Sequence, residues 1–129
     1  MARTVFDTEE LDQIRDLARR FAQDRVAPGY LAREKAGRMD MALVREMGQL
    51  GLIAPELPEA FGGMGAGTLY AGAIVEEIAR ADFTFAYVPL LASLNGQILA
   101  AFARPEIARD WLTRLTAGEI MLAIALTEP

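Results

Sequence analysis

The chain has 129 residues, and 53% of them are hydrophobic, which is enough for one domain with a single buried core. Its formal net charge is −5 and it has no tract rich in lysine or arginine, which argues against a nucleic-acid partner. The sequence has no cysteine and no histidine, which excludes disulfides, thiol nucleophiles and zinc sites of the usual ligand types.

The N-terminal residues turn acidic early and contain no continuous apolar run, so they do not form a secretory signal, and we expect a cytoplasmic protein. A first helix is predicted to begin at Asp7, whose side chain would cap it with Glu10 as the reciprocal partner. Apolar residues recur at helical spacing from Leu11 to Ala22, and Pro28 is expected to end this helix.

A second, shorter helix is predicted between Asp40, which can cap it, and Gly51, which is placed to stop it. Its apolar stripe consists of Leu43, Val44, Met47 and Leu50. Residues 54–67 then hold two prolines and four glycines, and this density of helix and strand breakers predicts an ordered loop. The loop lacks both the lysine of a Walker motif and a preceding strand, so a tight turn against a neighbouring helix is favoured over phosphate binding.

A third helix is predicted to begin at Thr68. Four of its side chains are expected to face the core: Tyr70, Ile74, Val75 and Ile78. The opposite face, with Glu76, Glu77 and Arg80, is expected to face water. Adjacent helical residues point about 100° apart, so the two glutamates do not form an acid–base pair.

No charged residue occurs in the 21 positions from Phe83 to Ala103, and Asp82 can cap a fourth helix there. The length is close to that of a membrane span. However, Pro89, Asn95 and Gln97 interrupt the stretch and no basic cluster flanks it, so we expect no span. A helix buried on nearly all sides explains the composition better.

A fifth helix is predicted from Pro105 to Gly118, with Ile107, Trp111, Leu112 and Leu115 on its inner face. Residues 120–126 are apolar throughout, which a buried strand or a helix fragment could both produce. Their length and the Ala-Gly turn before them favour a strand. Because a lone strand leaves its backbone groups unpaired along both edges, we expect it to pair with strands from another segment.

Four motifs, in this order and spacing, resemble the N-terminal half of the flavin-dependent acyl-CoA dehydrogenases. They are LGLIAPELPEAFGGMG (50–65), EEIARAD (76–82), WLTRLTAGEIM (111–121) and ALTEP (125–129). The resemblance covers nearly the whole chain from the first helix onward. It implies an all-α helical bundle over residues 1–118 and, over residues 119–129, a short C-terminal strand that begins a truncated middle β-domain.

The resemblance also implies a function. The chain would be the N-terminal portion of an FAD-dependent enzyme that dehydrogenates an acyl-CoA thioester between its α and β carbons. FAD is the implied cofactor. The implied partners are the acyl-CoA substrate and the missing middle and C-terminal domains or a partner subunit, in a homo- or hetero-oligomer. The carboxylate that removes the α-proton would lie beyond Pro129, so this chain alone is expected to be inactive. The alternative is a non-enzymatic helical interaction module derived from the same fold.

Particular residues are implicated by the same resemblance. Leu126 and Thr127 correspond to positions that touch the flavin ring, with Ile124 beside them. The fourth helix would line the acyl-chain pocket through five residues, Leu91, Leu94, Asn95, Ile98 and Leu99. For each of these five, simple core packing remains the alternative, and for Thr127 the alternative is a residue that merely ends a strand. No catalytic or metal-binding residue is implied within the chain. The stretch ARPEIARDWL (103–112) departs from the family pattern, so the class of acyl substrate stays open.

Overall fold

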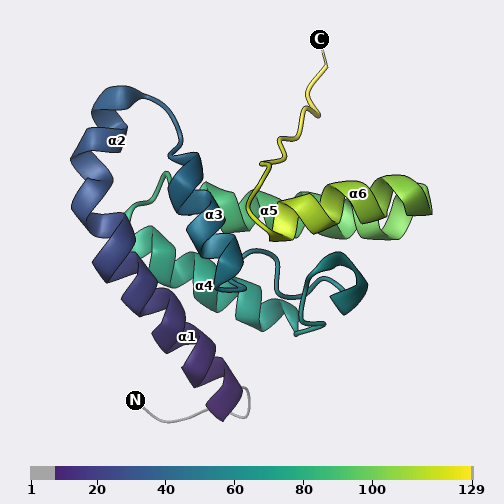
Figure 1. The fold of residues 1–129 in the computed structure, drawn as a ribbon, viewed down its shortest axis with the longest axis horizontal. Helices are drawn as coiled ribbons and strands as arrows, with labels where there is room; N and C mark the ends of the chain where they lie inside the picture. The colour runs from purple at the N-terminus through teal and green to yellow at the C-terminus, as the bar shows by residue number, and fades with distance from the viewer. Residues whose placement is uncertain (1–7, 129) are drawn as a thin grey trace.

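The computed structural model describes residues 8–128, which form a bundle of α-helices joined by short helical turns. The elements in chain order are α1 (Glu9–Phe21), η1 (Ala22–Val26), η2 (Ala27–Gly29), α2 (Tyr30–Ala36), α3 (Met41–Gln49), η3 (Glu59–Phe61), α4 (Thr68–Ala81), α5 (Tyr87–Phe102) and α6 (Pro105–Thr116). In Figure 1, α1 and α2 form one long bent column, and α5 and α6 lie side by side at the other end of the bundle. The predicted all-α fold is therefore confirmed.

The first helix begins one residue later than predicted. Thr8 is its N-cap, and the Thr8 hydroxyl accepts a hydrogen bond from the Leu11 N–H at 3.2 Å. The predicted cap, Asp7, lies outside the described residues. As the apolar spacing predicted, Leu11, Ala18 and Phe21 are buried.

Pro28 does not end the helical column, so that prediction was wrong. The helix widens into the π-helical turn η1, in which the Ala27 N–H bonds to the carbonyl of Ala22, five residues back. It then tightens into the 3₁₀ turn η2 around Pro28 and continues as α2. Because the hydrogen-bond pattern changes at Pro28, the missing proline N–H does not interrupt the helical column. The sequence pattern treated Pro28 as a helix end and therefore did not predict α2.

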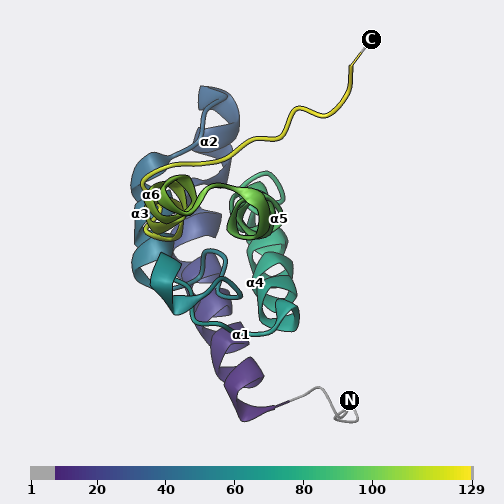
Figure 2. The ribbon, with the colours of Figure 1, turned by 90° about the vertical axis from the view of Figure 1, so that its right-hand side faces the viewer.

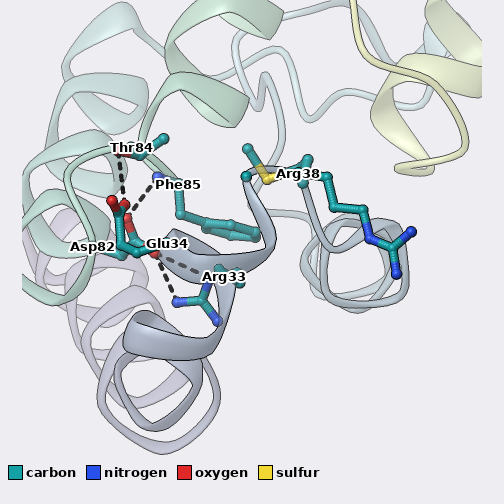
Figure 3. Close-up of a pocket in the computed structure, with 8 residues that line it drawn as sticks. Arg33, Glu34, Arg38, Asp82, Thr84 and Phe85 are labelled. Carbon is teal, nitrogen blue, oxygen red and sulfur yellow. Dashed lines mark hydrogen bonds and ion pairs between the residues drawn. The ribbon is translucent and has the colours of Figure 1, made fainter.

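An ion pair between Arg33 of α2 and Asp82 holds this column against the α4–α5 turn (Figure 3). Both side chains are largely buried, and Arg33 Nη2 lies 2.8 Å from Asp82 Oδ2. Arg33 also donates to the carbonyl of Val26, next to the proline turn, and lies over the ring of Phe85. Asp82 Oδ1 accepts from the Phe85 N–H, so Asp82 caps the turn that leads into α5 rather than α5 itself, whose N-cap is Ala86.

α1 packs most extensively against α4, and charged pairs connect the two helices. The prediction that Glu77 faces water was wrong, because it is 2% exposed and both of its carboxylate oxygens accept from Arg19 of α1. Glu76 is exposed, and hydrogen bonds from Arg80 and Arg15 lower its pKa. A lowered folded-state pKa stabilises the fold above the unfolded-state value, and this contribution is lost as pH falls through the folded-state pKa.

α3 has both of its predicted boundaries. Asp40 accepts from the N–H groups of Ala42 and Leu43, and Gly51 adopts a φ of +73° immediately after the helix. The Gly51 N–H bonds to the Gly48 carbonyl and the Leu52 N–H to the Met47 carbonyl, which is the Schellman pattern. Within the predicted stripe, Leu43, Val44 and Met47 are buried and Leu50 is exposed.

Residues 54–67 form the expected ordered loop. It doubles back on itself, because the N–H groups of Met64 and Ala66 both bond to the carbonyl of Pro55. The Thr116 hydroxyl at the end of α6 donates to the Phe61 carbonyl at 2.8 Å, which fixes the loop to the bundle. A Cβ atom on Gly62 would lie 2.4 Å from that hydroxyl, so the loop crosses α6 as closely as a tight turn requires.

In the third predicted helix, α4, Ile74 and Ile78 are buried as expected, whereas Tyr70 and Val75 are only half-buried. In α6, Leu112 and Leu115 are buried, whereas Ile107 is half-buried and Trp111 is 41% exposed. The two less buried α6 side chains face the space beside α5, as described below.

The predicted strand over residues 120–126 does not form, since no part of the described chain outside the helices has strand structure. Ile120, Met121 and Leu122 pack against the bundle, and the segment then leads away from it in an extended path (Figure 2). A strand requires a partner strand for its backbone hydrogen bonds, and the helical bundle offers none. None of the helices over residues 8–128 is long and apolar enough to cross a membrane.

The Arg33–Asp82 pair predicts a large effect of removing one charge. Asp82→Asn would leave the Arg33 guanidinium buried without a counter-charge, and should lower the free energy of unfolding by about 3–5 kcal/mol. Urea denaturation measures this loss. The matched control is Asp110→Asn, which breaks an exposed pair with Arg114 at 3.9 Å and should cost under about 1 kcal/mol. Equal, small losses in both variants would contradict the assigned role of the pair.

Replacing a glycine in the folded-back loop and replacing one in α4 should change the stability of the protein in opposite directions. A Cβ on Gly63 would lie 1.9 Å from the carbonyl oxygen of Leu57, so Gly63→Ala should destabilise the protein by about 1–3 kcal/mol or more. Gly72 lies on the exposed side of α4 with nothing within 4 Å of its Cβ position, so Gly72→Ala should stabilise the protein by about 1 kcal/mol. Thermal unfolding of the two variants beside the parent tests both signs.

Candidate functional site

A pocket of about 300 Å³ lies between α5, α6 and the segment that leaves the bundle. None of its lining residues is charged, and all but one are apolar. They are Asn95, Ile98, Leu99, Ile107, Trp111, Leu122, Ala123 and Ile124. Uncharged walls with a single polar group are typical of a site for an apolar or mostly apolar ligand.

α5 has two different faces, and the pocket lies at the boundary between them. One face is buried against the bundle through Val88, Ala92 and Gly96. The other is an exposed stripe at helical spacing, composed of Tyr87, Leu90, Leu94, Ile98 and Phe102. The prediction of a helix buried on nearly all sides was therefore wrong for this chain, because the bundle covers only one face of it.

Asn95 is the polar member of the pocket. It is 7% exposed, and its side-chain Nδ2 is buried without a hydrogen-bond partner among the described residues. The other polar side chains at this level of α5 are Ser93 and Gln97, two residues to either side and about 200° around the helix. Both donate to Glu56 Oε1 of the loop, and the other oxygen of that carboxylate, Oε2, is also buried without a hydrogen-bond partner among the described residues.

α6 contributes Ile107 and Trp111, which the sequence pattern assigned to the core rather than to a site. Trp111 has its ring under the guanidinium of Arg114, which lies 5.8 Å from the ring centroid. The signal that could have identified them is their position: they occupy the edge of the α6 stripe, whereas Leu112 and Leu115 occupy its centre.

The segment that leaves the bundle, residues 120–128, is called here the outgoing segment. It forms the third wall of the pocket with Leu122, Ala123 and Ile124. The backbone groups of residues 120–128 have no hydrogen-bond partner within the described part of the chain. Leu126 and Thr127 are exposed beyond the pocket. This segment therefore presents unpaired N–H and C=O groups together with apolar side chains.

The structure brings together four of the eight residues proposed from the sequence, namely Asn95, Ile98, Leu99 and Ile124. The other four lie outside the pocket lining. Leu91 is half-buried and Leu94 belongs to the exposed stripe, while Leu126 and Thr127 follow the pocket along the chain.

Another hollow, of about 280 Å³, lies beside the Arg33–Asp82 pair (Figure 3). Three of its charged groups already have partners: Arg33 pairs with Asp82, and Glu34 accepts a hydrogen bond from the Thr84 hydroxyl. Figure 3 shows the side chain of Arg38 pointing away from the carboxylates. Over residues 8–128, no group of three acidic side chains that could hold a metal ion is present. The pocket beside α5 is therefore the strongest candidate site.

Comparison with known proteins agrees with this architecture. Residues 8–119 match the family described as acyl-CoA dehydrogenase, N-terminal domain, and the chain belongs to that family. It is 34% identical over 128 residues to the mitochondrial long-chain specific acyl-CoA dehydrogenase of Sus scrofa, covering 98% of this chain and 29% of that protein.

Solved structures show the same fold. The butyryl-CoA dehydrogenase of Megasphaera elsdenii superposes with a TM-score of 0.84 at 27% identity, covering 100% of this chain and 34% of that one. A glutaryl-CoA dehydrogenase of Mycobacterium smegmatis in complex with FADH2 shares the fold at 22% identity, with a TM-score of 0.82, covering 89% of this chain and 30% of that one. The chain thus spans about a third of the length of the proteins that it matches.

The exposed stripe of α5 predicts self-association of the isolated chain. Leu94→Lys places a charge in the middle of the stripe, and should reduce both self-association and binding of an apolar dye. Its stability should change by less than about 0.5 kcal/mol, because Leu94 is exposed. The contrasting variant is Val88→Lys, which buries a charge on the other face and should unfold the chain. Sedimentation and dye fluorescence measure the outcome, and a monomeric parent that binds no dye would contradict it.

Proposed function

We propose that this chain is the N-terminal helical portion of an FAD-dependent acyl-CoA dehydrogenase, which dehydrogenates an acyl-CoA thioester between its α and β carbons. The observation that carries the proposal is the uncharged pocket between α5, α6 and residues 122–124. Membership of the family supplies the reaction class, and the pocket supplies a wall suited to an acyl chain.

The role of the pocket in this proposal is to bind the acyl chain, orient it and keep water away from it. Ile98, Leu99, Ile107 and Trp111 offer apolar surface, and burying the acyl methylenes against them contributes roughly 0.8 kcal/mol each. Since none of the lining side chains titrates, the pocket itself takes no part in proton transfer. The residue that removes the α-proton is assigned to no position in this chain.

The flavin contacts are proposed for the outgoing segment. A flavin ring edge needs hydrogen-bond donors and acceptors beside an apolar surface, and residues 123–126 combine unpaired backbone groups with exposed apolar side chains. This donor set fits the group, with Ile124 and Leu126 against the ring and Thr127 adding its hydroxyl. Bound FAD would supply the acceptor for the β-hydride.

In this proposal the division of the chain lies at residue 118, where the bundle gives way to the outgoing segment. Residues 119–129 begin a middle β-domain, and that domain and a C-terminal domain, or a partner subunit, cover the stripe of α5. The assembled enzyme is a homo- or hetero-oligomer, and acyl-CoA is its substrate.

The test is to express the chain joined to the middle and C-terminal dehydrogenase domains and to measure flavin content and acyl-CoA-dependent dye reduction. The proposal expects a yellow protein that reduces the dye, and no reduction by the chain alone. A colourless, stable protein without activity would favour the alternative, in which the stripe of α5 makes this chain a helical interaction module.

Thr127 provides a narrower prediction within the assembled flavoprotein. Thr127→Ala removes one hydroxyl and leaves its flavin partner unsatisfied, so the affinity for FAD should fall about tenfold or more. The thermal stability of the helical bundle should not change, because Thr127 is exposed and outside it. Thr113→Ala, on the exposed side of α6, is the control and should leave FAD binding unchanged. If the parent and Thr127→Ala bind FAD with equal affinity, the Thr127 hydroxyl does not contact the flavin.

A further inference from the structure

We propose that Gly48 and Gly118 are positioning residues for the pocket beside α5, because the backbone contact between them sets where the outgoing segment starts. That segment supplies the third wall of the pocket through Leu122, Ala123 and Ile124. The placement of the wall follows from the fold alone, whereas its consequence for acyl-CoA and FAD rests on the proposed function.

Gly48 lies in the last turn of α3, where alanine would favour the helix more than glycine does. A Cβ atom there would lie 2.5 Å from the Ala117 carbonyl oxygen and 2.7 Å from the Gly118 N atom, in the turn that follows α6. Ordinary contact begins at 3.4 Å, so any side chain at position 48 would push the two backbones about 1 Å apart. The glycine therefore allows an approach that alanine would prevent.

Gly118 meets α3 from the other side of the same contact. Its φ is +71°, and a Cβ atom on it would lie 2.8 Å from Arg45 Cα and closer still to the Val44 carbonyl oxygen. Its N–H and that of the next residue bond to carbonyls in the last turn of α6 at 3.0 and 2.9 Å, which is the Schellman pattern. One residue thus ends α6 and places that end against the backbone of α3.

The outgoing segment depends on this contact because its own backbone makes no hydrogen bond within residues 8–128. Ile120, Met121 and Leu122 pack on the bundle through their side chains. Ile124 is only six residues from Gly118, a reach of roughly 20 Å at full extension. Figure 1 shows the segment leaving from the end of α6 that lies beside α3. The turn at Gly118 therefore sets the point and direction from which the pocket wall starts.

Trp111 can report the position of the wall, because it is the single tryptophan of the sequence and lines the same pocket. Gly48→Ala should move the end of α6 by about 1 Å and loosen the wall against the indole ring. In the full chain, at concentrations where sedimentation shows a monomer, we expect the native emission maximum to shift to longer wavelength, because water then reaches more of the ring. Far-UV circular dichroism of the same sample checks that the helices remain.

Two controls separate positioning from loss of stability. Gly51→Ala alters a glycine of similar conformation, with a φ of +73°, but nothing lies within 4 Å of its Cβ position, so the emission maximum should not change. Leu11→Ala removes a buried side chain from the first turns of α1, at the end of the bundle away from the outgoing segment (Figures 1 and 2). It should lower the melting temperature at least as much as Gly48→Ala without shifting the emission maximum.

A second pair of variants decides the case if Gly48→Ala does not fold. Asparagine tolerates a left-handed φ, so Gly118→Asn and Gly51→Asn carry similar backbone strain. Only Gly118→Asn adds a Cβ atom against α3, and only it should shift the Trp111 emission.

The assembled flavoprotein tests what the placement does for the site. A displacement of about 1 Å in Gly48→Ala should lower kcat/KM for acyl-CoA by about 10²-fold, whereas Leu11→Ala should keep the value of the parent.

An unchanged emission maximum in folded Gly48→Ala, or the same shift in Leu11→Ala, would overturn the inference. A shift that leaves kcat/KM at the parent's value would show that the wall moves without serving the site, and would overturn the positioning role. If the assembled parent binds no flavin and reduces no dye, the proposed function fails by itself, and the emission measurements on the full chain still decide whether the two glycines place the wall.

Discussion

The Asp82 carboxylate fixes the position from which α5 starts, and the site depends on that position. One of its oxygens accepts from Arg33 of α2 and the other from the Phe85 N–H of the following turn. Arg33 in turn bonds the Val26 carbonyl beside the proline turn and lies over the Phe85 ring. A buried pair of this kind contributes little net stability compared with an apolar replacement, but its geometry is specific. It joins the bend of the long N-terminal column to the start of the helix that forms the pocket.

α5 can form a site because the bundle covers only half of it. Gly96 lets the helix approach closely, since a Cβ there would lie 3.0 Å from Leu57 Cδ1 and 3.6 Å from Leu115 Cδ2. The loop and α6 therefore hold one side of the helix, and the opposite side keeps its apolar stripe exposed. The pocket lies where these two faces meet α6 and the outgoing segment, so its shape depends on the same close approach.

Local signals in the sequence predicted much of this fold. Asp40 and Gly51 bound α3 because capping and a left-handed φ depend on single residues and their neighbours. Other features depend on contacts across the fold. Glu77 is buried because Arg19, 58 residues away, pairs with it, and α2 continues the column because a π-helical turn followed by a 3₁₀ turn accommodates Pro28. The 120–126 segment is apolar enough for a strand, yet pairing requires a partner that local pattern cannot supply.

The same distinction between local sequence pattern and contacts across the fold applies to the candidate site. Helical spacing on an uncharged segment is enough to place Asn95, Ile98 and Leu99 near one another, whereas the meeting of α5 with Ile107 and Trp111 requires the packing of two helices. The unpaired state of Asn95 is still less local, because it depends on which polar neighbours are already engaged. Glu56 accepts from Ser93 and Gln97 through Oε1, while its Oε2 is, like Asn95 Nδ2, buried without a partner among the described residues. The two buried polar atoms without a partner, Asn95 Nδ2 and Glu56 Oε2, are therefore set by how α5 packs against its neighbours, which the spacing of residues along one helix cannot predict.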